Sequence, residues 1–342
     1  MMAKILVTGG LGYIGSHTVV ELIKHKHDVI IIDNLSNSDI IILEKIYSIT
    51  NIMPAYEQVD ICDMEKLNTV FSTYPNIDAI IHFAAFKAVG ESVEDSLKYY
   101  KNNVSGMIHI LQCMKTYNVP HIIFSSSCTV YGQPAELPVT EKAPIQKATS
   151  PYGNTKQICE EILSDAIHSY NSFSAIILRY FNPVGAHESG IIGELPKGVP
   201  NNLVPFITQT AAGIRDELKI FGDDYNTPDG SAIRDYIYVV DLARAHVIAA
   251  NRLITNSNKR ECEVFNLGTG TGVSVLEMVH TFEKATGIQI PYTIVERRAG
   301  DIEKVWADTK YANTELGWKA ETPLKNILAS AWEWEKNIRH II

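Results

Sequence analysis

Residues 4–15 read KILVTGGLGYIG and contain the turn that decides the fold. A short apolar run leads into glycines at positions 9, 10, 12 and 15, and the last three satisfy the pattern G-x-G-x-x-G. Such glycines permit a tight turn, close approach of a pyrophosphate, and packing of the next helix against the strand. The same pattern also occurs in ordinary glycine-rich turns, so its surroundings decide what it does.

Apolar runs and helical patterns alternate through the first half of the chain. The runs are rich in Ile and Val and lack a period of two: DVIIID (28–33), DAIIHFAA (78–85), HIIFSSS (121–127) and SAIILRYF (174–181). Such runs are typical of parallel strands buried on both faces. Apolar residues recur at three and four positions between them, over 13–26, 63–74, 92–118 and 152–170. The alternation predicts an α/β fold with a doubly wound parallel sheet, the Rossmann arrangement.

The alternation of apolar runs and helical patterns ends after Asn182. The segment 182–202, NPVGAHESGIIGELPKGVPNN, carries four glycines and three prolines and predicts a long irregular connection. Loops of that length are usually functional. Strand-like pieces follow at 235–240 and 263–268, and helical patterns at 203–213, 241–254, 274–286 and 323–338. We expect a first domain over 1–182, rejoined near 234–250 and 264–270, and a smaller mixed α/β substrate domain mainly over 183–342.

Composition narrows the class of protein. The 30 Lys and Arg residues face 39 Asp and Glu residues, and the net charge of -9 disfavours general binding of nucleic acid or acidic lipid. The first apolar run reaches its glycines too soon for a signal peptide, and no stretch is long enough to span a membrane, so we expect a cytoplasmic protein. The five cysteines are scattered without C-x-x-C, and the 11 histidines are dispersed. We therefore expect free thiols and no structural metal.

The second apolar run ends at Asp33, 18 residues after Gly15. A carboxylate there can accept hydrogen bonds from the ribose hydroxyls of a dinucleotide and would repel a 2′-phosphate. Because no arginine follows directly, the pattern favours NAD over NADP. The segment VDICD (59–63) ends a further predicted strand, and its Asp60 and Ile61 are placed to flank the adenine, although an aspartate there equally fits a helix N-cap.

The segment SPYGNTK (150–156) places Tyr152 and Lys156 four residues apart at the start of a predicted helix, so both side chains share one face. A neighbouring ammonium and the positive nicotinamide would favour the phenolate of a tyrosine, which then serves as a base. The run FSSSCTVYG (124–132) ends a predicted strand about 25 residues earlier and supplies hydroxyls. Y-x-x-x-K alone is common on helix surfaces, but the three motifs in this order indicate dehydrogenase chemistry.

With these motifs the chain resembles the extended short-chain dehydrogenases/reductases and, among them, the UDP-glucose 4-epimerases. The resemblance extends over nearly the whole chain and includes DNLSNS, YYKNNVSG, LRYFNPVGAH, GVPNNLVPFI, RDYIYVVDLA, FNLGTG and ERRAGDIEKVWAD. It implies a tightly held NAD, a two-domain fold, and a homodimer formed by helices of the first domain.

The resemblance also implies roles for individual residues. The catalytic residues would be Tyr152, Lys156 and Ser127. The residues that bind NAD would be Gly9, Gly12, Tyr13, Ile14, Gly15, Asp33, Asn34, Asn37, Asp60, Ile61, Phe83, Ala84, Lys87, Asn102, Tyr152, Lys156 and Tyr180. The residues that bind the UDP-sugar would be Lys87, Ser127, Phe181, Asn182, Asn202, Leu203, Phe221, Arg234, Arg298, Asp301 and Val305.

The implied reaction interconverts UDP-glucose and UDP-galactose. Tyr152 takes the O4 proton, C4 gives hydride to NAD, the 4-keto sugar turns over, and hydride returns to its opposite face. Arg234 and Arg298 suit a pyrophosphate because guanidinium groups bind phosphate oxygens bidentately. Binding energy concentrated on the nucleotide would leave the sugar free to turn.

Three positions depart from the usual family pattern. Ala85 replaces a common glycine and Cys128 a common alanine, and both are small. Val305 stands where some members carry a tyrosine that narrows the sugar pocket, so we hypothesise that UDP-GlcNAc and UDP-GalNAc are also accepted; alternatively, Val305 only fills space.

Two rival functions remain at this stage. Related dehydratases carry an Asp-Glu pair, and decarboxylases a Glu, where this chain has Cys128 and Thr129. Without an acid there, elimination of water lacks a proton donor. A non-catalytic NAD-sensing module could lose Tyr152 or Lys156 freely, and this chain keeps both.

Overall fold

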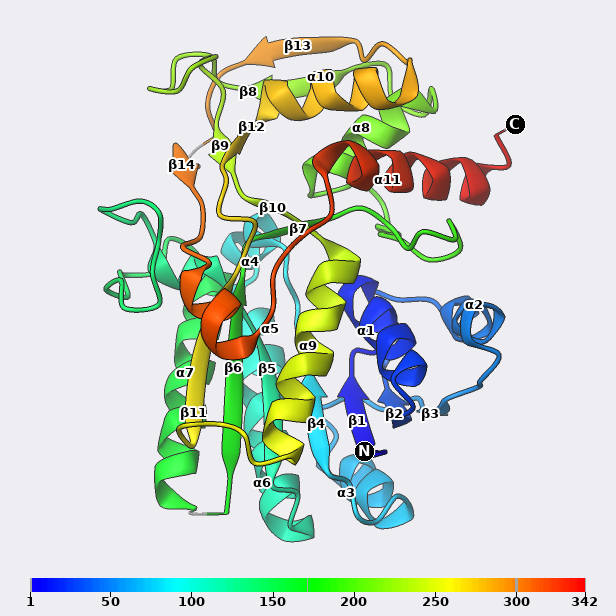
Figure 1. Cartoon of the computed structure of the whole chain (residues 1–342), viewed down its shortest axis with the longest axis vertical. Helices are drawn as coiled ribbons and strands as arrows, with labels where there is room; N and C mark the ends of the chain where they lie inside the picture. The colour runs from blue at the N-terminus through cyan, green and yellow to red at the C-terminus, as the bar shows by residue number, and fades with distance from the viewer. Residues whose placement is uncertain (1, 171, 299–300, 342) are drawn as a thin grey trace.

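The computed structural model describes residues 2–170, 172–298 and 301–341. One parallel sheet of seven strands forms the centre of the first half, in the order β11-β6-β5-β4-β1-β2-β3 (Figure 1). These strands are β1 (Lys4–Thr8), β2 (Asp28–Ile32), β3 (Ala55–Glu57), β4 (Ala79–His82), β5 (His121–Ser127), β6 (Ser174–Tyr180) and β11 (Cys262–Leu267). The predicted doubly wound α/β fold is therefore confirmed.

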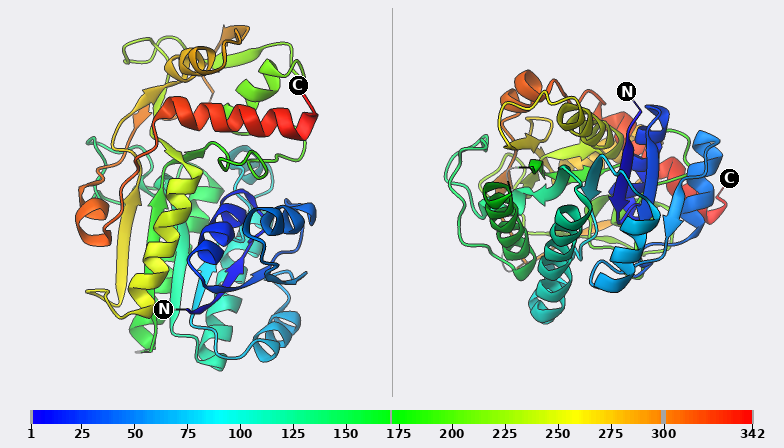
Figure 2. Two further views of the ribbon diagram at one scale, coloured as in Figure 1. Left: turned by 45° about the vertical axis from the view of Figure 1, so that its right-hand side comes forward. Right: turned by 90° about the horizontal axis from the view of Figure 1, so that it is seen from below.

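Helices cover both faces of this sheet, as the view from below in Figure 2 shows. One face packs against α1 (Tyr13–Lys24), α2 (Ile41–Thr50) and α9 (Val239–Ile254). The other face packs against α3 (Met64–Thr73), α6 (Ser105–Tyr117) and α7 (Pro151–Ser169). Within β1, Ile5 and Val7 enter the first core and Leu6 the second. Burial on both sides explains why the strand sequences show no alternation of apolar and polar residues.

The order in which strands are added to the sheet reverses between β1 and β4. The chain runs outward from β1 to β2 and β3, then crosses back so that β4 pairs with the other side of β1. Loops that follow β1 and β4 therefore leave the sheet in opposite directions and open a crevice at the strand carboxyl ends. Ligands of such sheets bind at this point.

The predicted helix over 92–118 is wrong as a single element. The structure divides this region into α4 (Val89–Glu94), α5 (Ser96–Tyr99), a π-helical turn η1 (Tyr100–Val104) and α6. Asp95 interrupts the helix with an extended φ of -134°, and its side chain accepts a hydrogen bond from the Lys98 backbone N–H at 3.2 Å. The aspartate thus begins a new helix because it competes for backbone donors as an N-cap.

The second half forms a layer above the carboxyl ends of the main strands (Figure 1). Its small sheets pair β7 (Asn182–Val184) with β10 (Tyr236–Tyr238), β8 (Leu218–Phe221) with β13 (Tyr292–Val295), and β9 (Ile233–Arg234) with β12 (Val273–Ser274) and β14 (Lys304–Val305). Its helices are α8 (Leu203–Ala211), α10 (Val275–Thr286) and α11 (Leu324–Arg339). Short helical turns η2 (Cys128–Tyr131) and η3 (Ala312–Leu316) complete the fold.

Two elements of the later chain return to the main sheet. Strand β11 pairs in parallel with β6, and α9 packs beside α1. The strand predicted over 235–240 is shorter than expected, because α9 already begins at Val239. None of the described helices combines the length and apolar composition that a membrane crossing requires.

Candidate active site

A cavity of about 420 Å³ lies at the carboxyl ends of the central strands. It brings together most of the residues that the sequence assigned to NAD and to catalysis. They are Gly9, Gly12, Tyr13, Ile14, Gly15, Asp33, Asn34, Asn37, Ile61, Phe83, Ala84, Lys87, Asn102, Ser127, Tyr152, Lys156 and Tyr180. Segments more than 150 residues apart thus form a single site.

The glycine turn packs so closely against neighbouring backbone that two of its positions have no space for a side chain. Gly9 adopts a φ of +68°, and a Cβ there would lie 2.9 Å from the Ala84 backbone nitrogen. A Cβ on Gly15 would lie 2.2 Å from the Gly9 oxygen. Helix α1 begins directly after Gly12, so its N-terminus and positive dipole end border the cavity. The turn fits the pyrophosphate of a dinucleotide.

Asp33 directly follows β2 and links the glycine turn to the following loop. Its Oδ2 accepts from the Leu11 backbone N–H at 3.1 Å, and its Oδ1 accepts from the Leu35 backbone N–H at 2.9 Å and from the Ser38 hydroxyl at 2.7 Å. A carboxylate has about four lone-pair sites, so these bonds leave capacity for a ribose hydroxyl. The residue therefore serves as a turn anchor while it still lines the cavity.

Asp60 is the predicted cofactor residue that does not line the cavity. Its carboxylate accepts from the Asn34 side-chain amide at 3.0 Å and from the Cys62 backbone N–H at 2.8 Å. Ile61 lines the cavity instead. The N-cap of α3 is Asp63, whose side chain accepts from the Lys66 backbone N–H at 3.1 Å.

The three candidate catalytic residues come from β5 and α7. Ser127 is the last residue of β5, and its hydroxyl caps η2 by accepting from the Thr129 backbone N–H at 3.2 Å. Helix α7 begins where the Ser150 hydroxyl accepts from the Gly153 backbone N–H, with Pro151 in the first turn. Its first two turns present Tyr152 and Lys156 to the cavity.

Burial shifts the pKa values of both residues on α7. Burial raises the pKa of the Tyr152 phenol to about 12, against the lowering effect of the hydrogen bond with Ser127. Burial also lowers the pKa of Lys156 to about 8, and its ammonium donates to the Ser125 carbonyl at 2.6 Å. Lys156 Nζ lies 6.0 Å from the Tyr152 ring centre. Burial therefore favours the neutral phenol of Tyr152, whereas a positive charge placed nearby would favour the phenolate.

A buried polar network behind Ser127 had no place in the sequence analysis. The Glu160 carboxylate pairs with the Arg179 guanidinium and accepts from the Ser126 hydroxyl, and both charged side chains are about nine-tenths buried. Arg179 also donates to the Tyr131 hydroxyl at 3.0 Å. An arginine inside the apolar run 174–181, and a glutamate four residues after Lys156, were the available signals.

The predicted UDP-sugar residues fall into two groups. Phe181, Asn182, Asn202 and Lys87 line the cavity, and Leu203 begins α8 next to Asn202. Phe221, Arg234, Arg298 and Asp301 gather around the small sheets instead. The Arg298 guanidinium lies 4.8 Å from the Phe221 ring centre and donates to Asp301 at 3.0 Å, and Arg234 lies 4.0 Å from Asp301.

The whole chain is similar to proteins of known activity. The family profile described as GDP-mannose 4,6 dehydratase matches residues 6–331. A UDP-glucose 4-epimerase from Dictyostelium discoideum is 50% identical over 332 residues, which cover 97% of this chain and 95% of the relative. The chain belongs to the UDP-glucose 4-epimerase family.

Solved structures of epimerases agree with this membership. A UDP-glucose 4-epimerase from Stenotrophomonas maltophila, with bound NAD and formylated UDP-arabinopyranose, superposes with a TM-score of 0.95 at 46% identity, over 99% of this chain and 100% of that one. The enzyme from Bifidobacterium longum, in complex with NAD+ and UDP, gives a TM-score of 0.94 at 47% identity with the same coverage.

Two departures from the family pattern sit together in this structure. Val305 is buried, and it packs in an apolar cluster with Phe181, Tyr131 and Val139, with Cys128 at the edge. Phe181 lines the described cavity, and Val305 does not. Burial raises the pKa of the Cys128 thiol to about 12, so it is an unreactive packing group.

The described residues show no group of three or more His, Cys, Asp or Glu side chains placed to hold a metal ion. All five cysteines are free thiols, and Cys113 and Cys159 are fully buried.

Proposed function

We propose that this protein interconverts UDP-glucose and UDP-galactose by transient oxidation at C4, with NAD as its resident cofactor. The observation that carries the proposal is the shared cavity, in which Ser127, Tyr152 and Lys156 lie beside the glycine turn and Asp33. A sugar hydroxyl placed against Tyr152 would therefore be close to a dinucleotide held at α1. The family membership and the epimerase relatives support the same reaction.

The residues present fit NAD. Gly9, Gly12 and Gly15 line the cavity at the start of α1, and Asp33, directly after β2, keeps acceptor capacity. NAD supplies a hydride acceptor that returns the hydride to the sugar C4. Lys156 would hold the nicotinamide ribose and place its ammonium near the Tyr152 phenol, and Ser127 would share the sugar O4 with that phenol.

Tyr152 is assigned as the group that takes the O4 proton and later returns it. A phenol with a pKa of about 12 is a weak base at neutral pH, so its deprotonation needs the positive charges that assemble only in the holoenzyme. Since the proton returns to the same oxygen, the protein neither gains nor loses protons in one cycle. The absence of a net proton change is consistent with an isomerisation.

The substrate residues are assigned to the nucleotide and the sugar separately. Arg234 and Arg298 would bind the UDP diphosphate, and Phe221 would pack against uracil, while Asn182 and Asn202 would contact the substrate within the main cavity. Contacts concentrated on UDP leave the sugar free to present either face of C4. We also propose that the cofactor half comprises 1–182 together with α9 and β11, because both return to the main sheet.

Incubation of the purified protein with UDP-galactose, without added cofactor, tests the reaction by product chromatography. Conversion to UDP-glucose is the expected result. If no conversion occurs even with NAD supplied, the epimerase proposal fails and a dehydratase, a decarboxylase or an NAD sensor must be considered.

The small residue at 305 supports a second substrate class, the N-acetylated UDP-hexosamines. Val305 shares an apolar cluster with Phe181, a cavity residue, so a larger side chain at 305 would have to displace members of that cluster. Conversion of UDP-GalNAc by the native protein, and its selective loss in Val305→Tyr, is the expected result. Failure of the native protein to convert UDP-GalNAc contradicts this extension alone.

Exposed apolar residues of α4, α5 and α6 support a homodimer. Val93 and Leu97 are 65% and 78% exposed, and Val89 and Ile108 lie in the same elements. Large apolar side chains exposed together mark interaction sites. Light scattering should give twice the chain mass for the native protein and the single mass for Leu97→Asp; a native monomer would contradict the dimer.

A further inference from the structure

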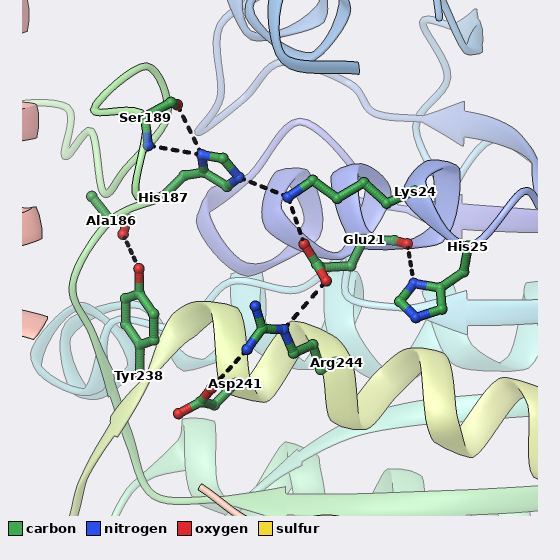
Figure 3. Close-up of polar contacts among 9 residues, drawn as sticks. All are labelled: Glu21, Lys24, His25, Ala186, His187, Ser189, Tyr238, Asp241 and Arg244. Atoms are coloured by element: carbon green, nitrogen blue, oxygen red, sulfur yellow. Dashed lines mark hydrogen bonds and ion pairs between the residues drawn. The ribbon is translucent and has the colours of Figure 1, made fainter. Parts of the chain in front are cut away.

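The segment between β7 and α8 is held at its start by residues of β10 and α1 (Figure 3). The Tyr238 hydroxyl donates to the Ala186 carbonyl at 2.7 Å, and Lys24 Nζ lies 3.1 Å from His187 Nε2. Lys24 also pairs with Glu21 at 3.0 Å, and Glu21 lies 3.4 Å from Arg244 of α9. The segment therefore leaves β7 in a fixed direction.

The same segment is held again where it reaches the cavity. Gly193 faces the Trp334 ring so closely that a Cβ would lie 2.5 Å from it, and Trp334 Nε1 donates to the Glu194 carbonyl at 3.0 Å. The Glu194 backbone is thus placed by α11. Its side chain lines the cavity and is only 13% exposed.

One oxygen of the Glu194 carboxylate contacts both Lys87 and Asn202. Glu194 Oε1 accepts from Lys87 Nζ at 3.0 Å and from the Asn202 side-chain amide at 2.6 Å. Lys87 belongs to the loop after β4, and Asn202 directly precedes α8. We propose that Glu194 is a positioning residue that orients Asn202 and Lys87 for the UDP-sugar, an inference that rests on the proposed epimerase function.

The orientation follows from hydrogen-bond chemistry. A carboxylate only accepts, so the Asn202 amide must turn its NH₂ group toward Glu194. One of the two N–H donors is then occupied, and the second donor and the carbonyl oxygen face the substrate in a fixed arrangement. Lys87 has a long flexible stem, and its bond to Glu194 selects one position for the ammonium.

The negative charge of Glu194 is neutralised by Lys87, so it is compatible with binding of a diphosphate nearby. An isolated carboxylate would repel the diphosphate of UDP, but its ion pair with Lys87 cancels most of that field at short range. The pair therefore provides orientation with little net charge at the mouth of the site.

The experiment measures steady-state rates with UDP-galactose under saturating added NAD, so that loss of cofactor does not affect the result. Glu194→Ala should raise KM about tenfold and change kcat less than threefold. Glu194→Gln keeps an acceptor oxygen and should stay within about twofold of the native KM. Glu188→Ala is the matched control because Glu188 is an exposed glutamate of the same segment, and its KM should be unchanged.

A second measurement excludes a merely structural role. In an Asn202→Ala background, Glu194→Ala should raise KM less than threefold, because its partner is already absent. An unchanged KM in Glu194→Ala, a Glu194→Gln variant as impaired as Glu194→Ala, or full additivity with Asn202→Ala would each overturn the inference. Native protein that fails to convert UDP-galactose would instead overturn the proposed function.

Discussion

The cofactor half and the substrate half of the site are built in different ways. In the cofactor half, residues sit at the ends of long parallel strands, and the ion pair behind them, Glu160–Arg179, is about nine-tenths buried. In the substrate half, Arg298 pairs with Asp301 on short sheets, and the Arg298 side chain is 56% exposed. The second half also has an apolar core, between α8, α10 and α11. We conclude that the site residues of the first half are fixed by packing against the sheet, whereas the guanidinium groups of Arg234 and Arg298 are oriented largely by Asp301.

Loss of the Tyr152 hydroxyl should cause the largest fall in kcat, because it removes the proposed proton acceptor. It tests whether the proton transfer depends on a residue of the cofactor half. Tyr152→Phe should lower kcat by about 10²- to 10⁴-fold, the usual contribution of a general acid or base. NAD content, read from absorbance after denaturation, should match the native protein. A kcat within tenfold of native would place the proton transfer elsewhere.

Removal of one buried charge should show how far the cofactor half depends on its core. Glu160→Ala leaves Arg179 unpaired in the interior, and we expect the free energy of unfolding to fall by about 3–5 kcal/mol. Urea denaturation measures this change. The double variant Glu160→Leu with Arg179→Met should recover much of the loss, because no unpaired charge remains; a loss below about 1 kcal/mol in Glu160→Ala would contradict the packing argument.

Acid should destabilise the cofactor half first. Burial lowers the pKa of His17 and His82 to about 3 and that of His246 to about 4, from an ordinary value of 6.5. The unfolded chain therefore binds more protons than the folded chain below pH 6.5, so stability is full above that pH and declines as pH falls toward 4.

Urea midpoints between pH 7.5 and 4.5 should show this decline, and His246→Leu should make it shallower. His280→Gln is the control, because His280 is an exposed residue of α10 in the substrate half. An unchanged slope in His246→Leu would show that this histidine does not contribute.

A substitution in the substrate half should change the KM for substrate more than the free energy of unfolding. Asp301→Asn removes the partner of Arg298 and Arg234, yet partly exposed ion pairs contribute about 1 kcal/mol or less. We expect a small change in the urea midpoint and a rise of several-fold in KM for UDP-galactose, because both guanidinium groups lose their orientation. A KM equal to native would show that Asp301 does not position them.

Much of the fold could be predicted from short stretches of sequence, because turns, strands and helix starts depend on neighbouring residues. The glycine turn, the apolar runs and the helix starts at Tyr13 and Pro151 lie where the patterns predicted them. The helix over 92–118 was mispredicted, since the apolar periodicity continues across Asp95 although its side chain starts a new helix. Periodicity reports which residues share a face of a helix, and it does not report where a side chain competes for backbone donors.

The candidate site was predictable where residue type and strand end coincide, as for Asp33, Ser127 and Tyr152. Residues whose role depends on a distant partner were missed. Glu194 meets Lys87 across 107 positions, and Arg179 meets Glu160 from a neighbouring element. No local pattern encodes such pairs.

By itself, the sequence determined the sheet, the dinucleotide turn and the types of residue available for chemistry, because these depend on periodicity, on glycine conformation and on the identity of side chains. Only the tertiary structure decided which charges are paired, that Val305 and Phe181 join one apolar cluster, and that Tyr152 is buried enough to raise its pKa to about 12. These properties depend on distances between remote segments and on exclusion of water, and both exist only after the chain has folded.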